Sequence, residues 1–108
     1  MEPSGGGGIV MRIHRVRAEI VVAACDEELL GQDLPVGTQG RTVRVSPQFY
    51  GERRVGREEL LWALARATTA NLLGARTIAL AQEGGILDGG ATGSLGGVPH
   101  AEIFTMPS

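Results

Sequence analysis

The chain has 108 residues, of which 43% are hydrophobic, a formal net charge of −2 and one cysteine. This length suits one domain with one core and excludes two full-sized domains, and the near-neutral charge excludes a global field that attracts nucleic acid. A single cysteine excludes an intrachain disulfide and a multi-cysteine metal site, and the sequence shows no signal peptide or apolar run of spanning length, so we expect a cytoplasmic protein without a membrane segment.

The first half of the chain predicts short strands joined by turns. Residues 1–8 (MEPSGGGG) lack apolar periodicity and predict a disordered leader ahead of a single domain over residues 9–108. Apolar and basic residues alternate over residues 9–16, and residues 19–24 form a β-branched apolar run. These two segments predict a hairpin that turns at Arg17 and Ala18.

The stretch that follows the hairpin predicts a turn, a loop and a third strand. Asp26 is placed to cap a short helical turn, and residues 32–40 contain the proline and glycines of a loop. Residues 42–45 then alternate as a strand, which Ser46 and Pro47 end.

Residues 57–74 predict the longest helix of the chain. Apolar positions recur at helical spacing around Leu64, Gly56 stands as the N-cap and Gly74 as the stop. A second helix is predicted over residues 76–83.

Two residues of the long predicted helix do not fit a simple amphipathic pattern. Asn71 falls inside the apolar stripe, where we expect it to hydrogen bond to a loop backbone, with residues 98–100 as the candidate segment. Trp62 falls on the polar side beside Arg66, so these two residues are candidates for an interface with a second subunit or another partner.

The C-terminal part is rich in glycine. Residues 84–97 contain seven glycines without a nucleotide-binding pattern, and predict a flexible loop rather than a phosphate cradle. Residues 101–106 predict the last strand. The order of elements predicts an α+β fold of two layers, a mostly antiparallel sheet of about four strands with two helices packed on one face.

Four motifs occur in order along the chain: AACDEELLG, FYG, ANLLG and GGVPHAEIF. With them the sequence resembles a family of small archaeal proteins known as domain of unknown function 424, over nearly all of its length from Met11 onward. The resemblance implies a compact α+β protein of an archaeal cytoplasm. It implies no particular activity.

Charge and aromatic residues single out residues 41–57 as the best candidate binding segment. All basic residues of the chain are arginines, and this segment sets five of them against Glu52 alone. Guanidinium groups suit phosphates, and aromatic rings in a turn can stack on bases. The candidate nucleic-acid-binding residues are Arg41, Arg44, Phe49, Tyr50, Arg53, Arg54 and Arg57.

A purely structural interpretation of the same segment also stands. In it Phe49 enters the core with Tyr50 at its edge, and the arginines pair with Glu58, Glu59 or the acidic turn at residues 26–28.

Cys25 and His100 are the weaker candidates for chemistry. Cys25 precedes a predicted helical turn, but three neighbouring carboxylates disfavour its thiolate, so a buried structural cysteine is the favoured interpretation. His100 stands at the start of the last strand, as an exposed base or as a histidine bonded to a local carbonyl. We expect no metal site and no cofactor, because no cluster of ligand residues is visible.

Three functions are open from the sequence. The leading hypothesis is a non-enzymatic module that binds RNA or a ribonucleoprotein through residues 41–57. The second is a small enzyme that uses Cys25 or His100 beside the glycine-rich loop. The third is a protein-interaction or homo-oligomer module that uses the Trp62 face.

Overall fold

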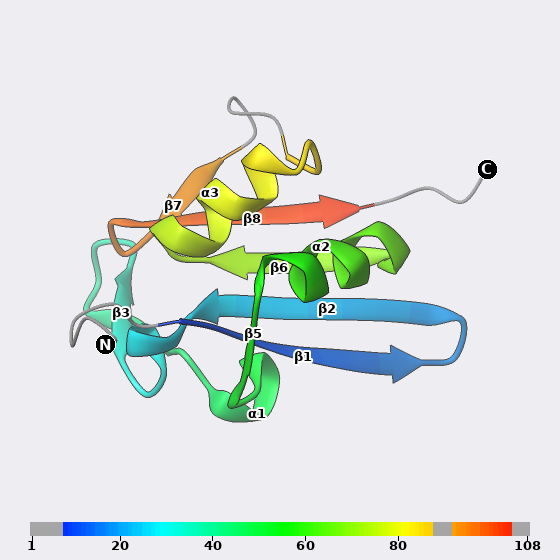
Figure 1. Ribbon diagram of the computed structural model, residues 1–108. Helices are drawn as coiled ribbons and strands as arrows, with labels where there is room; N and C mark the ends of the chain where they lie inside the picture. The colour runs from blue at the N-terminus through cyan, green and yellow to red at the C-terminus, as the bar shows by residue number, and fades with distance from the viewer. Residues whose placement is uncertain (1–7, 88–91, 105–108) are drawn as a thin grey trace.

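A six-stranded sheet separates two helices on one face from a small hairpin and a short helix on the other (Figure 1). The computed structural model describes residues 8–87 and 92–104. Its elements in chain order are β1 (Ile9–Val16), β2 (Glu19–Asp26), a 3-10 turn (Glu27–Leu29), β3 (Asp33–Val36), β4 (Arg41–Arg44), α1 (Pro47–Tyr50), β5 (Arg53–Val55), α2 (Arg57–Arg66), β6 (Thr69–Leu73), α3 (Ala75–Glu83), β7 (Gly93–Leu95) and β8 (Val98–Phe104).

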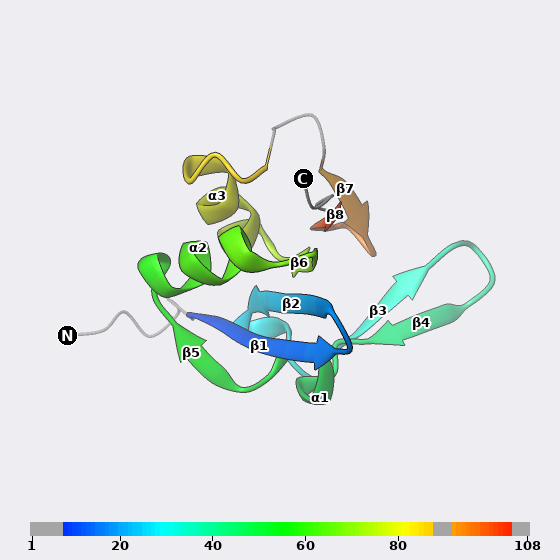
Figure 2. The ribbon, with the colours of Figure 1, turned by 90° about the vertical axis from the view of Figure 1, so that its right-hand side faces the viewer.

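The main sheet has the strand order β5-β1-β2-β6-β8-β7, and β3 and β4 pair with each other in a second, two-stranded sheet. Only β2 and β6 run parallel, and the other neighbours are antiparallel. Figure 1 shows α2 and α3 in front of the strands, and Figure 2 shows α1 and the β3–β4 hairpin on the side away from α2. The predicted α+β class with a mostly antiparallel sheet is confirmed.

The predicted number of about four strands is wrong. Strands β5 and β7 have three residues each, which is too short for a period of two to show in the sequence. Residues 42–45 were expected in the main sheet, but β4 pairs only with β3, in the stretch predicted to be a loop.

The predicted hairpin of β1 and β2 is confirmed. Val16 pairs with Glu19, which leaves Arg17 and Ala18 as the turn. Successive side chains of β1 point to opposite faces, so Met11 packs in the core beneath α2 and α3 while Val10 packs in a second core on the other face.

The long helix predicted over residues 57–74 is wrong beyond Arg66. Helix α2 begins at Arg57 with Gly56 as its N-cap, as predicted, but Ala67 turns into an extended conformation and the rest of the segment forms β6, at the centre of the sheet. In this strand Ala70, Leu72 and Leu73 are buried, and Thr69 and Asn71 are half-buried. The same apolar residues satisfy both periods over so short a stretch, and the pairing with β2 and β8 selects the strand.

The end of the predicted helix has another role. Gly74 does not stop a helix; with φ of 112° it is the N-cap of α3. A side chain there would collide with the carboxylate of Asp26, because a Cβ would lie 2.3 Å from Cγ. The second predicted helix is confirmed, with α3 starting one residue earlier than expected.

Asp26 caps a different helix from the one predicted. It precedes the 3-10 turn but makes no side-chain cap bond to it. Its buried carboxylate instead accepts hydrogen bonds from the backbone N–H groups of Arg76 (3.1 Å) and Thr77 (2.8 Å), at the start of α3. The Thr77 hydroxyl donates a third bond of 2.8 Å.

The predictions for residues 1–8, 84–97 and 101–106 agree with the structure only in part. The last strand begins at Val98, earlier than predicted, and residues 105–106 of the prediction lie outside the described residues. The glycine tract holds a strand, β7, where a loop was predicted. Of the predicted leader, only Gly8 is described; its N–H donates to the Glu27 carboxylate and its carbonyl accepts from the Glu27 N–H.

Candidate functional site

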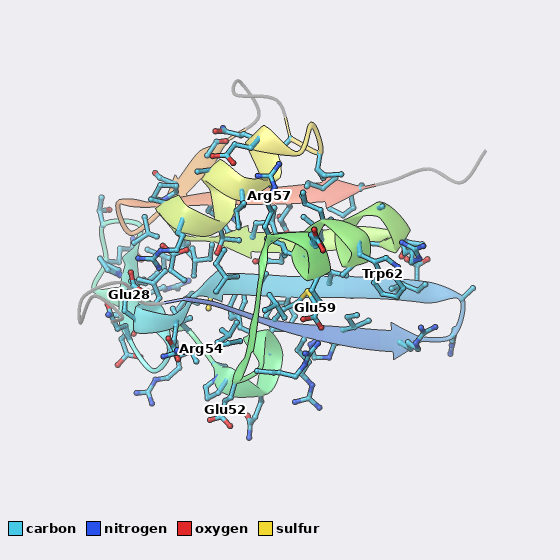
Figure 3. All side chains as sticks on the ribbon, in the orientation of Figure 1. Glu28, Glu52, Arg54, Arg57, Glu59 and Trp62 are labelled. Atoms are coloured by element: carbon cyan, nitrogen blue, oxygen red, sulfur yellow. The ribbon has the colours of Figure 1, made fainter. Side chains whose placement is uncertain are left out.

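The arginines predicted to bind nucleic acid lie on three elements and most of them are paired. Arg41 and Arg44 belong to β4, Arg53 and Arg54 to β5, and Arg57 is the first residue of α2. Four of the five form ion pairs: Arg44 with Asp33 (2.8 Å), Arg53 with Glu59, Arg54 with Glu27 (2.8 Å) and Arg57 with Glu83 (2.7 Å). Figure 3 shows Arg54 on β5 and Arg57 at the start of α2, set apart from each other. The positive charge of this segment is therefore largely neutralised by nearby carboxylates.

The aromatic pair of the same segment is divided between surface and core. Tyr50 is 6% exposed and packs in the second core, whereas Phe49 is 36% exposed. The Phe49 ring stacks on His14, with 5.3 Å between centroids and 19° between planes, and meets Tyr50 edge to face. Nε2 of His14 also donates a 2.7 Å bond to the Phe49 carbonyl. The buried and exposed roles are the reverse of those in the structural interpretation, and only Phe49 is accessible to a ligand.

Asn71 has a hydrogen-bond partner, but not the predicted one. It lies in β6, and its Oδ1 accepts a 2.7 Å bond from the Tyr50 hydroxyl rather than from a loop backbone. Burial raises the pKa of Tyr50 to about 12, with smaller contributions from Cys25 and Glu102.

Cys25 and His100 do not meet. Cys25 is fully buried, and burial, aided by the charges of Asp26 and Glu28, raises its thiol pKa to about 12. It pairs with Leu73, which pairs in turn with His100, so a strand separates the two side chains. Asp26 points to the opposite face of the sheet from Cys25 and caps α3. The arrangement supplies no nucleophile with an adjacent base.

Five arginines have no carboxylate partner among residues 8–87 and 92–104. Three of them, Arg12, Arg15 and Arg17, lie on β1 and its turn, and Arg66, the last residue of α2, lines a cavity together with Arg15; the fifth, Arg41, is on the β3–β4 hairpin. We call Arg12, Arg15, Arg17 and Arg66 the basic edge. Sequence reasoning missed it, although the alternation of basic and apolar residues in β1 was visible, because nothing in that pattern shows which arginines face a carboxylate.

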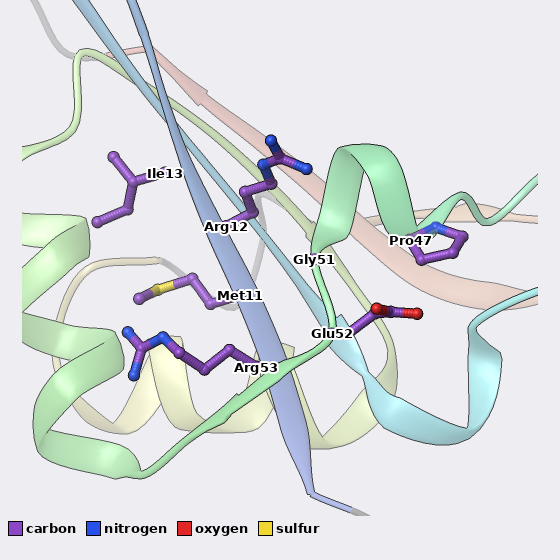
Figure 4. A pocket seen from close by; sticks show the side chains of 7 residues that line it. All are labelled: Met11, Arg12, Ile13, Pro47, Gly51, Glu52 and Arg53. Atoms are coloured by element: carbon purple, nitrogen blue, oxygen red, sulfur yellow. The ribbon is translucent and has the colours of Figure 1, made fainter.

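The basic edge borders the open side of strand β1. Strand β5 pairs with β1 only at residues 9–11, so residues 12–16 have no strand beside them on that side within the described chain. Where β5 leaves β1, a cavity of about 340 Å³ opens, lined by Met11, Arg12, Ile13, Pro47, Gly51, Glu52 and Arg53. Figure 4 shows Arg12 and Glu52 on one side of β1 and Ile13 and Arg53 on the other.

A second cavity lies between the hairpin end of β1 and β2 and helix α2. It has a volume of about 210 Å³ and is lined by Ile13, Arg15, Ile20, Trp62, Ala63 and Arg66. Trp62 is 54% exposed, and the guanidinium of Arg66 lies 4.1 Å from the centre of its ring. Trp62 and Arg66, which the sequence placed side by side, thus lie in contact with each other, and Trp62 borders the basic edge.

The fold and this edge define a small α+β protein with a six-stranded mixed sheet whose open strand is basic and flanked by two cavities. The chain belongs to the family described as Protein of unknown function (DUF424), whose model matches residues 14–106. This confirms the family resemblance.

The fold is similar to that of an uncharacterized conserved protein from Methanopyrus kandleri, known from a crystal structure. The two chains share 28% identity, with a TM-score of 0.80 and 93% of each chain covered. Comparison with curated proteins gives no match. Within the described residues, no helix has the length and apolar character needed to cross a membrane.

Proposed function

We propose that the protein is a non-enzymatic module that binds RNA or a ribonucleoprotein, in an archaeal cytoplasm as the family resemblance implies, through the basic edge rather than through residues 41–57. The observation that carries the proposal is the gathering of Arg12, Arg15, Arg17 and Arg66 around one open strand without carboxylate partners among the described residues.

The distinction between paired and unpaired arginines matters for an anionic ligand. A paired guanidinium and its carboxylate nearly cancel at a distance, so the pair neither steers nor holds a phosphate chain. A guanidinium without a carboxylate partner is not neutralised locally, so its positive charge and its remaining N–H donors can act on phosphate; Arg12 and Arg66 each donate one N–H to a backbone carbonyl, that of Gln48 and that of Trp62. The segment with the highest arginine density is therefore the weaker candidate, and the sparser basic edge is the stronger one.

The aromatic residues favour RNA over a purely ionic partner. Trp62 lies beside Arg66 within the edge, and Phe49 is held by His14, a residue of the same strand β1. Exposed rings next to arginines are a recurrent arrangement for single-stranded or looped RNA, because bases stack on the rings while guanidinium groups bind the phosphates. The separation of Cys25 from His100 gives no comparable support to the enzymatic alternative.

A matched pair of triple variants tests the proposal. One carries Arg12→Gln, Arg15→Gln and Arg17→Gln; the other carries Arg44→Gln, Arg54→Gln and Arg57→Gln, three arginines in ion pairs that line neither cavity, so both lose the same charge. Fluorescence anisotropy of a labelled RNA hairpin, measured from about 50 to 200 mM salt, gives the affinity and its salt dependence. We expect the first variant to bind at least about tenfold more weakly at low salt. The slope of its log affinity against log salt concentration should also be shallower, by the equivalent of about two phosphate contacts.

The control variant should keep most of the affinity, because its arginines are already neutralised. Equal losses in both variants would show that only net charge matters and would overturn the assignment to the basic edge. Absence of binding by the unmodified protein at low salt would overturn the proposed function itself. Thermal unfolding of each variant shows that the change in binding does not come from loss of fold.

A further inference from the structure

The 210 Å³ cavity beside Trp62 has apolar walls and a charged opening. Ile13 and Ile20 come from adjacent strands and Ala63 from the buried face of α2, while Arg15 and Arg66 stand at the border with solvent. Arg15 is the cross-strand partner of Ile20, so its side chain lies on the α2 face of the sheet. No carboxylate lines the cavity.

The size of the cavity limits what it can hold. Pockets for drug-sized ligands measure roughly 300–1,000 Å³, and this one falls below that range at about 210 Å³. It has room for one small, flat group and not for a larger cofactor. Trp62, labelled in Figure 3, lines the cavity. The residue is still 54% exposed.

We propose that this cavity takes one unstacked base of an RNA strand, which stacks against Trp62 while Arg15 and Arg66 hold the phosphates on either side of that nucleotide. The inference rests on the proposed function and specifies its ligand: a single-stranded or looped segment rather than a continuous duplex, whose bases remain stacked within the helix.

Charge complementarity selects this occupant over an apolar side chain of a partner protein. Two guanidinium groups border the cavity without a carboxylate partner among the residues that the structure describes, so an uncharged peptide would leave both without an anion. A nucleotide supplies both a flat ring for the apolar wall and an anion for the opening. The Arg66 guanidinium already lies 4.1 Å from the centre of the indole ring, so a positive charge stands directly beside the stacking surface.

The experiment uses the fact that Trp62 is the only tryptophan of the chain. Its fluorescence is followed while the full protein is titrated with a single-stranded oligouridylate and, separately, with a blunt RNA duplex of the same length. Anisotropy of the same labelled oligomers reports binding independently of the indole. We expect the single strand to bind more tightly than the duplex and to quench Trp62 emission in parallel with its anisotropy change.

Two variants sharpen the result. Trp62→Ala should weaken binding of the single strand by about tenfold or more, since stacking on an aromatic ring contributes about 1–3 kcal/mol per base. Phe104→Ala removes another exposed ring, 72% exposed on β8, and should leave the affinity unchanged. Because Trp62 is half exposed, its truncation leaves the core intact, and thermal unfolding verifies this.

The outcomes separate this inference from the proposed function. Binding by anisotropy without any change in Trp62 emission, or unaltered affinity of Trp62→Ala, would overturn the proposal that a base enters this cavity. It would leave the proposed RNA-binding function in place. If neither oligomer changed the anisotropy, both the cavity inference and the proposed function would be overturned. A fall in mass in solution on Trp62→Ala would show that a second copy of the chain covers the cavity, and would overturn the inference.

Discussion

The hydroxyl of Tyr50 donates a 2.7 Å hydrogen bond to Oδ1 of Asn71, across 21 positions of sequence. Tyr50 ends α1 on one side of β1, and Asn71 lies in β6, two strands further into the sheet. The bond therefore ties the connection between the two sheets to the centre of the larger one. Tyr50 is buried and Asn71 is half-buried, so the phenol depends on this bond for a hydrogen-bond partner.

Tyr50→Phe tests how much this hydrogen bond contributes to the free energy of unfolding. The substitution keeps the ring and leaves Asn71 Oδ1 without its donor, so we expect the free energy of unfolding to fall by about 1–2 kcal/mol. Urea unfolding of Tyr50→Phe, Asn71→Ala and the double variant gives the coupling energy between them. Strictly additive single losses would contradict a direct interaction.

Alkaline pH should destabilise the protein. Burial raises the pKa of Cys25 from 9.0 and of Tyr50 from 10.0, each to about 12. A raised folded-state pKa means that the folded protein holds the proton more tightly than the unfolded chain, so this stability is complete below pH 9 and is lost as pH rises from 9 towards 12. The loss is at most about 1.4 kcal/mol per pH unit for each group.

The composition makes this pH window easy to interpret. The chain has no lysine and only one tyrosine, so no other side chain of ordinary pKa titrates between pH 9 and 11. Urea unfolding across this range should show the decline, and Cys25→Ala should move its onset from about pH 9 to about pH 10. An unchanged onset in Cys25→Ala would contradict the role of the thiol.

Asp26→Ala should be among the most destabilising changes to a charged residue. It leaves the N–H groups of Arg76 and Thr77 and the Thr77 hydroxyl without their buried acceptor. We expect a loss of about 2 kcal/mol or more in urea unfolding. Glu28→Ala is the matched control, because it removes a nearby carboxylate that only makes an exposed ion pair with Arg76, and should cost about 1 kcal/mol or less. Similar losses for the two would rule out the capping role.

Thr68 fixes the point at which α2 gives way to β6. Its backbone N–H donates to the Ile20 carbonyl, and its Oγ1 accepts from the Ile20 N–H, both at 2.8 Å. Thr68→Val keeps the shape but loses the acceptor, so we expect a loss of about 1–2 kcal/mol in thermal or urea unfolding. Thr68→Ser retains the hydroxyl and should lose less; if serine were the worse of the two, methyl packing and not the hydrogen bond would set the stability.

Arg17→Gly should lower the RNA affinity without lowering the unfolding temperature. Among the described residues Arg17 alone, apart from glycines, has a positive φ, at 57°, a backbone region that costs L-residues about 1 kcal/mol or more. Glycine relieves this cost, so we expect the unfolding temperature to stay level or rise while RNA affinity in low salt falls, because one charge of the basic edge is lost. A clear fall in unfolding temperature would show that Arg17 stabilises the turn.

The β1–β2 hairpin followed from local pattern, whereas the second core, on the face of the sheet away from α2, did not. Alternation over residues 9–16 predicts β1 because successive side chains of a strand point to opposite faces, so one apolar face gives a period of two, and the paired partner follows directly after a two-residue turn. Helix α3 followed likewise, since its apolar residues recur with a helical period and two glycines follow it. Asn71 shows the limit: its need for a partner was evident from the sequence, but the donor came from α1.

By itself the sequence determined that the protein is α+β, that Cys25 is buried and that Gly56 begins a helix, because burial period and capping act over a few neighbouring residues. Only the tertiary structure decided that residues 69–73 form a strand, because pairing with β2 and β8 outweighs helical propensity over so short a stretch. It also decided which arginines have a carboxylate partner among the described residues. The carboxylates of Glu27 and Glu83 reach Arg54 and Arg57 across more than 25 positions, and such partners are set by the packing of whole elements and not by the local order of residues.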